Sequence, residues 1–267
     1  MARLIDDRFS RGFETARVLL GHRSFTSELA YAIRKEGGAD KAVRALLAAF
    51  GLGANPYAIS VEETLDRLRE ANDKNGWEIG DGVFAKLAKS APDWPADPLA
   101  FRSLRIRWGK GDEGVETTFR RHVKWIGTVL APRFREWGYL DPRSAYLQLL
   151  SGNETHRPVV EWVILDLGAH RERESVAKVR GADSIADEGL VLTWLFPEFV
   201  QEIDFLENPA FFLAGYKART QGEEGWRRVP ALLPESNGGA FLFANLIQND
   251  EIGYSVPTVR RPRTNEL

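Results

Sequence analysis

The sequence predicts a predominantly α fold with a minor β-sheet (α+β), in which an N-terminal helical bundle precedes a larger mixed region. Three observations support this prediction. Helix start and stop signals recur through residues 1–91, one clear alternating segment follows at residues 101–108, and apolar, aromatic segments beyond Gly181 are interpreted mostly as buried helices. We expect one sheet of few strands inside a mainly helical chain.

The N-terminal region carries the helix signals. Ser60 and Glu63 have the spacing of a capping box, in which the serine hydroxyl accepts from an early backbone amide of the helix. Two earlier helices are expected on either side of the pair Gly37 and Gly38, and the second should end at Gly51, because glycine readily adopts the left-handed conformation that ends a helix. Residues 1–91 are therefore predicted to be a helical region.

A proline-rich segment, APDWPADP at residues 91–98, separates this region from the rest. Proline lacks an amide donor and disfavours helix at the residue before it, so the segment is the best candidate for a domain boundary. It fits a rigid surface crossing equally well. The predicted division is a helical region at 1–91 and a mixed, mainly helical region at 99–267.

The mixed region opens with a predicted strand and helix. In FRSLRIRW, residues 101–108, apolar and basic side chains alternate as in a half-exposed strand, with Ser103, Arg105 and Arg107 on the exposed face. From Val115 to Leu130 the apolar residues recur with helical spacing, and Pro132 should end or kink that helix.

The later elements are predicted with less distinct patterns. Asp141 and Pro142 resemble the start of a short helix that runs to about Leu150. Residues 158–170 fit either a helix or a strand. Beyond Gly181, buried helices are expected, with interruptions at Pro197 and Pro209.

Composition excludes several classes of function. The 267 residues include no cysteine, so disulfides, thiolate metal sites and cysteine nucleophiles are ruled out. The N-terminus has acidic residues and no apolar core like that of a secretory signal, and no apolar run is long enough to cross a membrane. We therefore expect a cytoplasmic protein that has no membrane partner.

Charge is distributed unevenly, although the net charge is only −2. Residues 101–144 contain ten Lys/Arg and five Asp/Glu, a local balance of +5, whereas residues 181–216 contain seven acids and no base. Opposite charges of this kind predict an attraction between the two segments, within one chain or between neighbouring chains.

The basic segment leads to the main functional hypothesis, a non-catalytic binding or assembly subunit that contacts nucleic acid without a cofactor. Lysine and arginine neutralise phosphates, and interleaved aromatic side chains such as Trp108, Trp125, Phe134 and Trp137 stack on unpaired bases or fill the core. Two alternatives are a plain solvated surface and a protein-docking subunit that uses 101–144 and 181–216. The predicted nucleic-acid-binding residues, within the strand-helix surface at 101–137, are Arg105, Arg107, Lys110, Arg120, Arg121, Lys124, Arg133 and Arg135.

The competing hypothesis is catalytic, a metal-dependent hydrolase or nuclease. Glu154, His156, Asp166 and His170 bracket an apolar run, and carboxylates with histidines supply general acid/base chemistry or metal ligands. Their spacing matches no standard metal-binding motif, and a loop and core element with locally satisfied polar groups explains the pattern as well.

Residues 109–114, GKGDEG, match the glycine spacing of a dinucleotide-binding loop and lie between the predicted strand and helix. Asp112 and Glu113 would place negative charge beside a pyrophosphate, which argues against that function. We interpret the segment as a glycine turn with acids placed favourably at a helix start.

Overall fold

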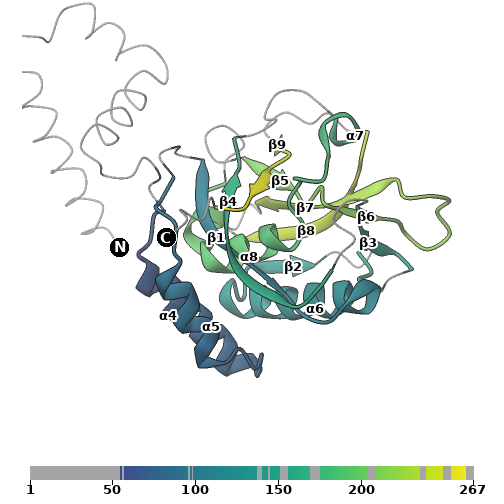
Figure 1. Ribbon diagram of the computed structural model, residues 1–267. Coiled ribbons are helices and arrows are strands. Elements are labelled where there is room, and N and C mark those ends of the chain that lie inside the picture. Colours follow the sequence, from purple (N-terminus) through teal and green to yellow (C-terminus); the bar gives the residue numbers. More distant parts are fainter. Residues whose placement is uncertain are drawn as a thin grey trace, which may run out of the picture. The chain divides into compact units, whose positions relative to one another are not determined.

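The computed structural model describes residues 55, 57–95, 97, 99–136, 140–143, 145–150, 156–168, 175–203, 209–234, 239–248 and 254–262. These residues belong to one compact unit that begins at Asn55. The predominantly α prediction is wrong, because this unit combines helices with a three-stranded and a seven-stranded sheet (Figure 1). The helices expected within residues 1–54 lie outside the described part of the chain.

Helices α4 (Val61–Asn75) and α5 (Asp81–Lys89) lie side by side in Figure 1. The predicted N-cap of α4 is confirmed, since Ser60 Oγ accepts from the amide of Glu63 at 3.0 Å. Gly76 ends α4 in the left-handed conformation, with φ of 60°. A cap at each end explains why this boundary could be read from the sequence.

We expect Ser60→Ala to lower the free energy of unfolding by about 1 kcal/mol, the typical cost of deleting an N-cap hydroxyl. The loss should appear as a lower midpoint in urea with an unchanged slope, because the surface exposed on unfolding stays the same. Ser60→Asp should retain most of the stability, since aspartate also caps helices. Equal losses in the two variants would contradict a capping role.

The proline-rich segment is held against the first strand by Arg102. Its guanidinium donates to the carbonyls of Ile59 (2.8 Å) and Pro92 (3.2 Å). It also lies over the ring of Trp94 at 5.1 Å and that of Trp162 at 5.5 Å. Burial lowers the pKa of Arg102, and the charge of Asp93 acts in the opposite direction. The carbonyls and aromatic rings hold the cation in place.

The three-stranded sheet has the order β1-β4-β10, all antiparallel. β1 (Ala100–Arg107) pairs along its whole length with β4 (Val159–Asp166), and β10 (Thr258–Arg260) pairs with the other edge of β4. The open question over residues 158–170 is thus settled as a strand for Val159–Asp166. The strand expected at residues 101–108 is confirmed as β1, but its half-exposed character is wrong, because every residue of β1 is buried.

Helix α6 (Gly111–Val129) follows β1 and is the long helix that runs beneath β2 in Figure 1. It confirms the predicted helix and begins four residues before Val115. Its buried side chains recur at helical spacing, as expected for an amphipathic helix with one face on the core. Helix α6 ends at Val129 with Leu130 as its C-cap residue, so the predicted end of the helix just before Pro132 is confirmed.

The seven-stranded sheet replaces helices that the sequence analysis expected. The short helix predicted after Asp141 contains a strand instead, and two apolar runs beyond Pro209 are also strands. β8 pairs with β7 over the full length of both, and this hairpin forms the middle of the sheet. The strands are β2 (Phe134–Glu136), β3 (Leu147–Leu149), β5 (Ala210–Phe212), β6 (Tyr216–Ala218), β7 (Arg228–Pro234), β8 (Ala240–Leu246) and β9 (Tyr254–Ser255).

α8 (Asp187–Leu195) is buried at every residue and lies between the two sheets in Figure 1. A Cβ added at Gly189 would overlap Leu213 Cδ2, so α8 packs closely on the segment that follows β5. Along the chain, the short helix α7 (Val176–Val179) precedes α8 and the short helix α9 (Pro197–Gln201) follows it. The helix predicted before Pro197 is therefore correct, and it occupies the centre of the core.

A membrane-spanning helix is not found in the described ranges, because none of their helices combines sufficient length with sufficient apolar character.

Candidate functional site

Arg105 and Arg107 were expected on an exposed face, but both lie inside the fold. Arg107 Nε donates to Asp187 Oδ2 at 2.5 Å, and Arg105 donates to the carboxylates of Glu188 and Glu161. The relative exposures of Arg105 and Arg107 are 9% and 7%. A charge in such surroundings needs a fixed partner, and the acids of α8 supply it.

The pKa values of this cluster agree with a closed ionic network. Burial by itself would raise the pKa of Glu188, but Arg105 and Arg107 outweigh it and lower the pKa to about 2. Burial likewise opposes the charge on Arg107, yet Asp187 and Glu188 raise its pKa above the usual arginine value. Tyr216 donates its hydroxyl to Asp187, and burial followed by that carboxylate raises the pKa of the phenol.

These contacts also show where the two oppositely charged segments meet. Arg105 and Arg107 belong to the basic segment at 101–144, and Asp187 and Glu188 belong to the acidic segment at 181–216. The predicted attraction therefore occurs within the chain for these four residues. Their charges are already matched and do not form part of an outward-facing basic surface.

The proposed catalytic residues that the structure describes lie far apart. His156 precedes β4 and accepts from the amide of Gly111 through its carbonyl, while Asp166 ends β4 opposite Ala100. The eight residues of β4 span roughly 25 Å at about 3.3 Å per residue. His156 and Asp166 are thus not brought together for direct acid/base work, and Glu154 and His170 lie outside the described residues.

Each of the two described side chains has local surroundings. Thr118 Oγ1 lies 3.2 Å from His156 Nε2, and burial lowers the pKa of this histidine. Asp166 Oδ1 accepts from the amide of Gly168 at 2.9 Å, a local contact at the end of β4. In the ranges open to description, no cluster of three or more metal-ligating side chains is present.

The glycines of GKGDEG are explained by the backbone itself. Gly109 and Gly111 have φ of +69° and +56°, and a Cβ on Gly114 would lie 2.8 Å from the carbonyl carbon of Gly109. The strand therefore turns sharply into α6. A hollow of about 260 Å³ adjoins this turn, and its lining includes both Asp112 and Lys217, so it does not present the uniformly positive surroundings that a pyrophosphate would need.

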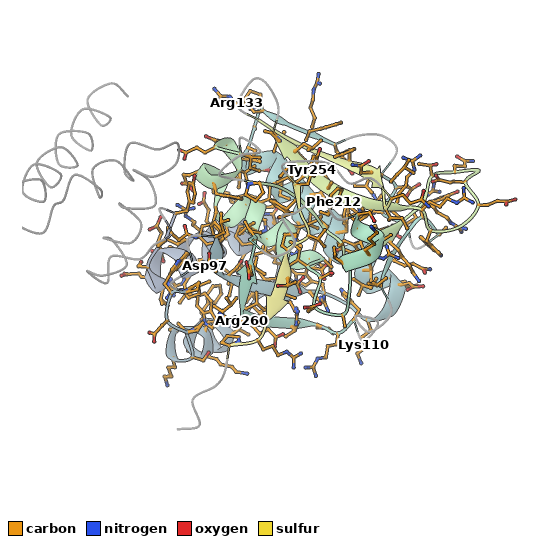
Figure 2. The ribbon with its side chains drawn as sticks, turned by 90° about the horizontal axis from the view of Figure 1, so that it is seen from above. Asp97, Lys110, Arg133, Phe212, Tyr254 and Arg260 are labelled. Atoms are coloured by element: carbon orange, nitrogen blue, oxygen red, sulfur yellow. The ribbon has the colours of Figure 1, made fainter. Side chains whose placement is uncertain are left out.

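The remaining predicted cations lie on α6 and just beyond it. Arg120 and Lys124 are exposed one turn apart, and the guanidinium of Arg121 lies 4.9 Å from the centre of the Trp108 ring. Lys110 and Arg133 are exposed on opposite sides of the molecule (Figure 2). Arg135 is exposed on β2. The eight predicted residues thus do not form a single patch.

Arg120 and Lys124 border a groove between α6 and β2, here called the α6 groove. Its volume is about 520 Å³, within the usual range of roughly 300–1,000 Å³ for ligand sites. Apolar side chains form much of its wall, and Glu136 adds one carboxylate. The lining residues are Phe119, Arg120, Val123, Lys124, Gly127, Phe134, Glu136 and Pro142.

Arg120, Lys124 and Phe134 were predicted from the sequence as binding residues, whereas Glu136 and Pro142 of the same groove were not. No local pattern could join them, because the groove forms where β2 pairs in parallel with β8, about a hundred residues later. Comparison of the chain with protein-family models, with curated proteins and with solved structures found no match. The chemistry of the α6 groove is therefore the basis for a functional proposal.

Proposed function

We propose that this protein is a non-catalytic binding subunit that contacts nucleic acid through the α6 groove. The observation that supports it is the meeting of two exposed cations, Arg120 and Lys124, with an apolar groove large enough for part of a ligand. Cations neutralise phosphates, and an apolar wall accommodates a base. A cytoplasmic location belongs to the same proposal.

The charge around the C-terminal half of α6 favours a polyanion. Between Glu116 and Glu136 the sequence holds five Lys/Arg and no acid. Arg120 donates to Glu116 at 3.0 Å, but this ion pair is exposed and joins residues four apart on one helix. Such pairs contribute about 0.3–0.5 kcal/mol, so a phosphate can recruit Arg120 at little cost.

The proposal predicts that the charge reversals Arg120→Glu and Lys124→Glu, combined in the full chain, weaken nucleic-acid binding at least about tenfold at low salt. Each lost phosphate contact should also lower the slope of log affinity against log salt by about 1, and so by about 2 for both. Fluorescence anisotropy with labelled DNA and RNA over a salt series measures both quantities.

A matched control carries the same charge change on another helix. Lys86 and Lys89 are exposed on α5, and their replacement by glutamate should leave the slope nearly unchanged. If the wild-type chain binds no nucleic acid at low salt, the proposal is wrong. If both double variants lose the same affinity, the binding depends on overall charge, and its assignment to the α6 groove is overturned.

A further inference from the structure

The shape of the α6 groove suits more than a phosphate. The ring of Phe134 lies against α6 at Gly127, where an added Cβ would be 3.7 Å from Phe134 Cδ1. Val123 and Pro142 extend the apolar lining. Phosphates need cations and amides, whereas walls of this kind favour a flat, weakly hydrated group.

The aromatic side chains of the basic segment differ in how accessible they are. Phe101, Phe119 and Trp125 are buried in the core, with at most 4% exposure. Trp108 is partly buried, and its ring lies 4.8 Å from that of Trp77. Of the aromatic rings that the structure describes between residues 101 and 136, Phe134 is the partly exposed one that lines the groove.

Glu136 places a hydrogen-bond acceptor in the same groove. As a residue it is exposed, yet its carboxyl is surrounded closely enough that the loss of water raises its pKa, with Arg120 acting in the opposite direction. A carboxylate repels phosphate but accepts well from an amino group. In nucleic acids the exocyclic amines of cytosine, adenine and guanine donate in this way. Thymine and uracil have no exocyclic amine.

Resting on the proposed function, we infer that the α6 groove holds one unpaired, amino-bearing base of a single strand. The base stacks on Phe134, Glu136 accepts from its exocyclic amine, and Arg120 and Lys124 contact the phosphates on either side. A duplex keeps its bases stacked and its amines paired, so it offers the groove phosphates alone. The protein should therefore prefer single strands, and oligo(dC) over oligo(dT).

Anisotropy titrations of the full chain with labelled oligo(dC), oligo(dT) and a mixed duplex, each of about 15 nucleotides, test this inference. We expect oligo(dC) to bind about tenfold more tightly than oligo(dT), the lower part of the range for a specific base contact. Glu136→Gln should bring the ratio close to one, because the amide both donates and accepts. Glu224→Gln, at an exposed site on the β6–β7 connection, should leave the ratio unchanged.

A second variant examines the stacking contact. Phe134→Leu keeps an apolar side chain on the short strand β2 but removes the ring, and it should weaken single-strand binding about tenfold while duplex binding is retained. Thermal unfolding of both variants establishes that they are folded. Retained duplex binding provides the same check within the binding assay.

The outcomes separate the inference from the proposed function. If single strands and duplex bind equally and both depend on Arg120 and Lys124, or if oligo(dC) and oligo(dT) bind equally, the base site is refuted and nucleic-acid binding stands. If nothing binds at low salt, both are refuted. Preference for oligo(dC) that persists in Glu136→Gln would overturn the role of Glu136.

Discussion

Arg107→Met is expected to lower the free energy of unfolding by about 3–5 kcal/mol, the largest effect of a single substitution that we anticipate. Methionine fills a similar volume but carries no charge, so Asp187 loses its partner and Glu188 loses one of two. Both carboxylates are almost fully buried, at 0% and 1% exposure. Asp187 then keeps the Tyr216 hydroxyl as its donor and Glu188 keeps Arg105, so the buried pair of carboxylates is left with one cation fewer, which disfavours the folded state.

Thermal and urea unfolding provide the measurement. For a unit of this size, each kcal/mol corresponds to roughly 2–4 °C, so the melting temperature should fall by about 10 °C. Arg69→Met is the matched control, since Arg69 pairs with Asp66 at 2.6 Å on the surface of α4. Exposed pairs contribute at most about 1 kcal/mol, and the control should lose no more than that.

A double variant identifies the source of the loss. Arg107→Met combined with Asp187→Asn should be less destabilised than the sum of the single losses, because the second change removes a charge that the first left unpaired. Strict additivity would contradict the claim that this ion pair is coupled. A loss below about 1 kcal/mol for Arg107→Met alone would show that water reaches the network.

The sequence allowed local features of the fold to be predicted where a short-range signal determines them. Ser60 accepts from the amide of Glu63, within one turn, and the apolar stripe of α6 recurs over about four turns. β1 was predicted from its alternation, but its burial was not. The basic face of β1 meets α8, whose acids come about eighty residues later in the chain. The face that was expected in solvent therefore forms buried ion pairs.

The helices predicted beyond Pro209 failed for a related reason. Segments such as Ala240–Leu246 are short, apolar and rich in residues that suit a helix, and a pattern of that length does not distinguish the two states. Pairing with β7 along the whole strand decided the outcome. Tertiary context of this kind overrides intrinsic propensity.

The uneven charge of the chain indicated an internal attraction more reliably than an outward-facing basic surface. It predicted the attraction between the basic and acidic segments, and Arg105 and Arg107 meet Glu188 and Asp187 as that attraction requires. It could not tell which cations the fold would use internally. That division depends on which face of β1 meets α8. Arg105 and Arg107 are therefore lost from the predicted binding surface, and Arg120 and Lys124 are the predicted cations that line the α6 groove.

Acidification should destabilise the protein through His122, a residue that no sequence pattern marked. This side chain is fully buried on α6, and its Nε2 lies 2.9 Å from the carbonyl oxygen of Ile106. Its Nδ1 accepts from Trp194 Nε1 at 3.2 Å. One ring nitrogen therefore donates and the other accepts, which is the pattern of a neutral imidazole.

Burial lowers the pKa of His122 to about 4 from an ordinary 6.5, with Asp187 and Glu188 acting against that shift and Arg121 adding to it. A protonated Nδ1 would also face the indole N–H of Trp194, donor against donor. The unfolded chain takes up the proton below pH 6.5, and the folded chain does so only near pH 4. Stability is thus complete above pH 6.5 and falls as the pH drops to about 4, by about 3 kcal/mol in total.

Urea unfolding from pH 7 down to pH 4, at constant ionic strength, measures this loss. His156 is also buried with a lowered pKa and contributes in the same direction, so the comparison that isolates His122 is wild type against His122→Gln. The glutamine can donate to the Ile106 carbonyl without titrating; we expect it to be less stable at pH 7 but to lose about 3 kcal/mol less on acidification. Glu188 affects both proteins alike: folding lowers its pKa from 4.5 to about 2, so its stabilisation is lost between those values, mostly below pH 4. Parallel curves for the two proteins between pH 6.5 and 4 would mean that the buried imidazole accepts a proton freely, contrary to its two hydrogen bonds.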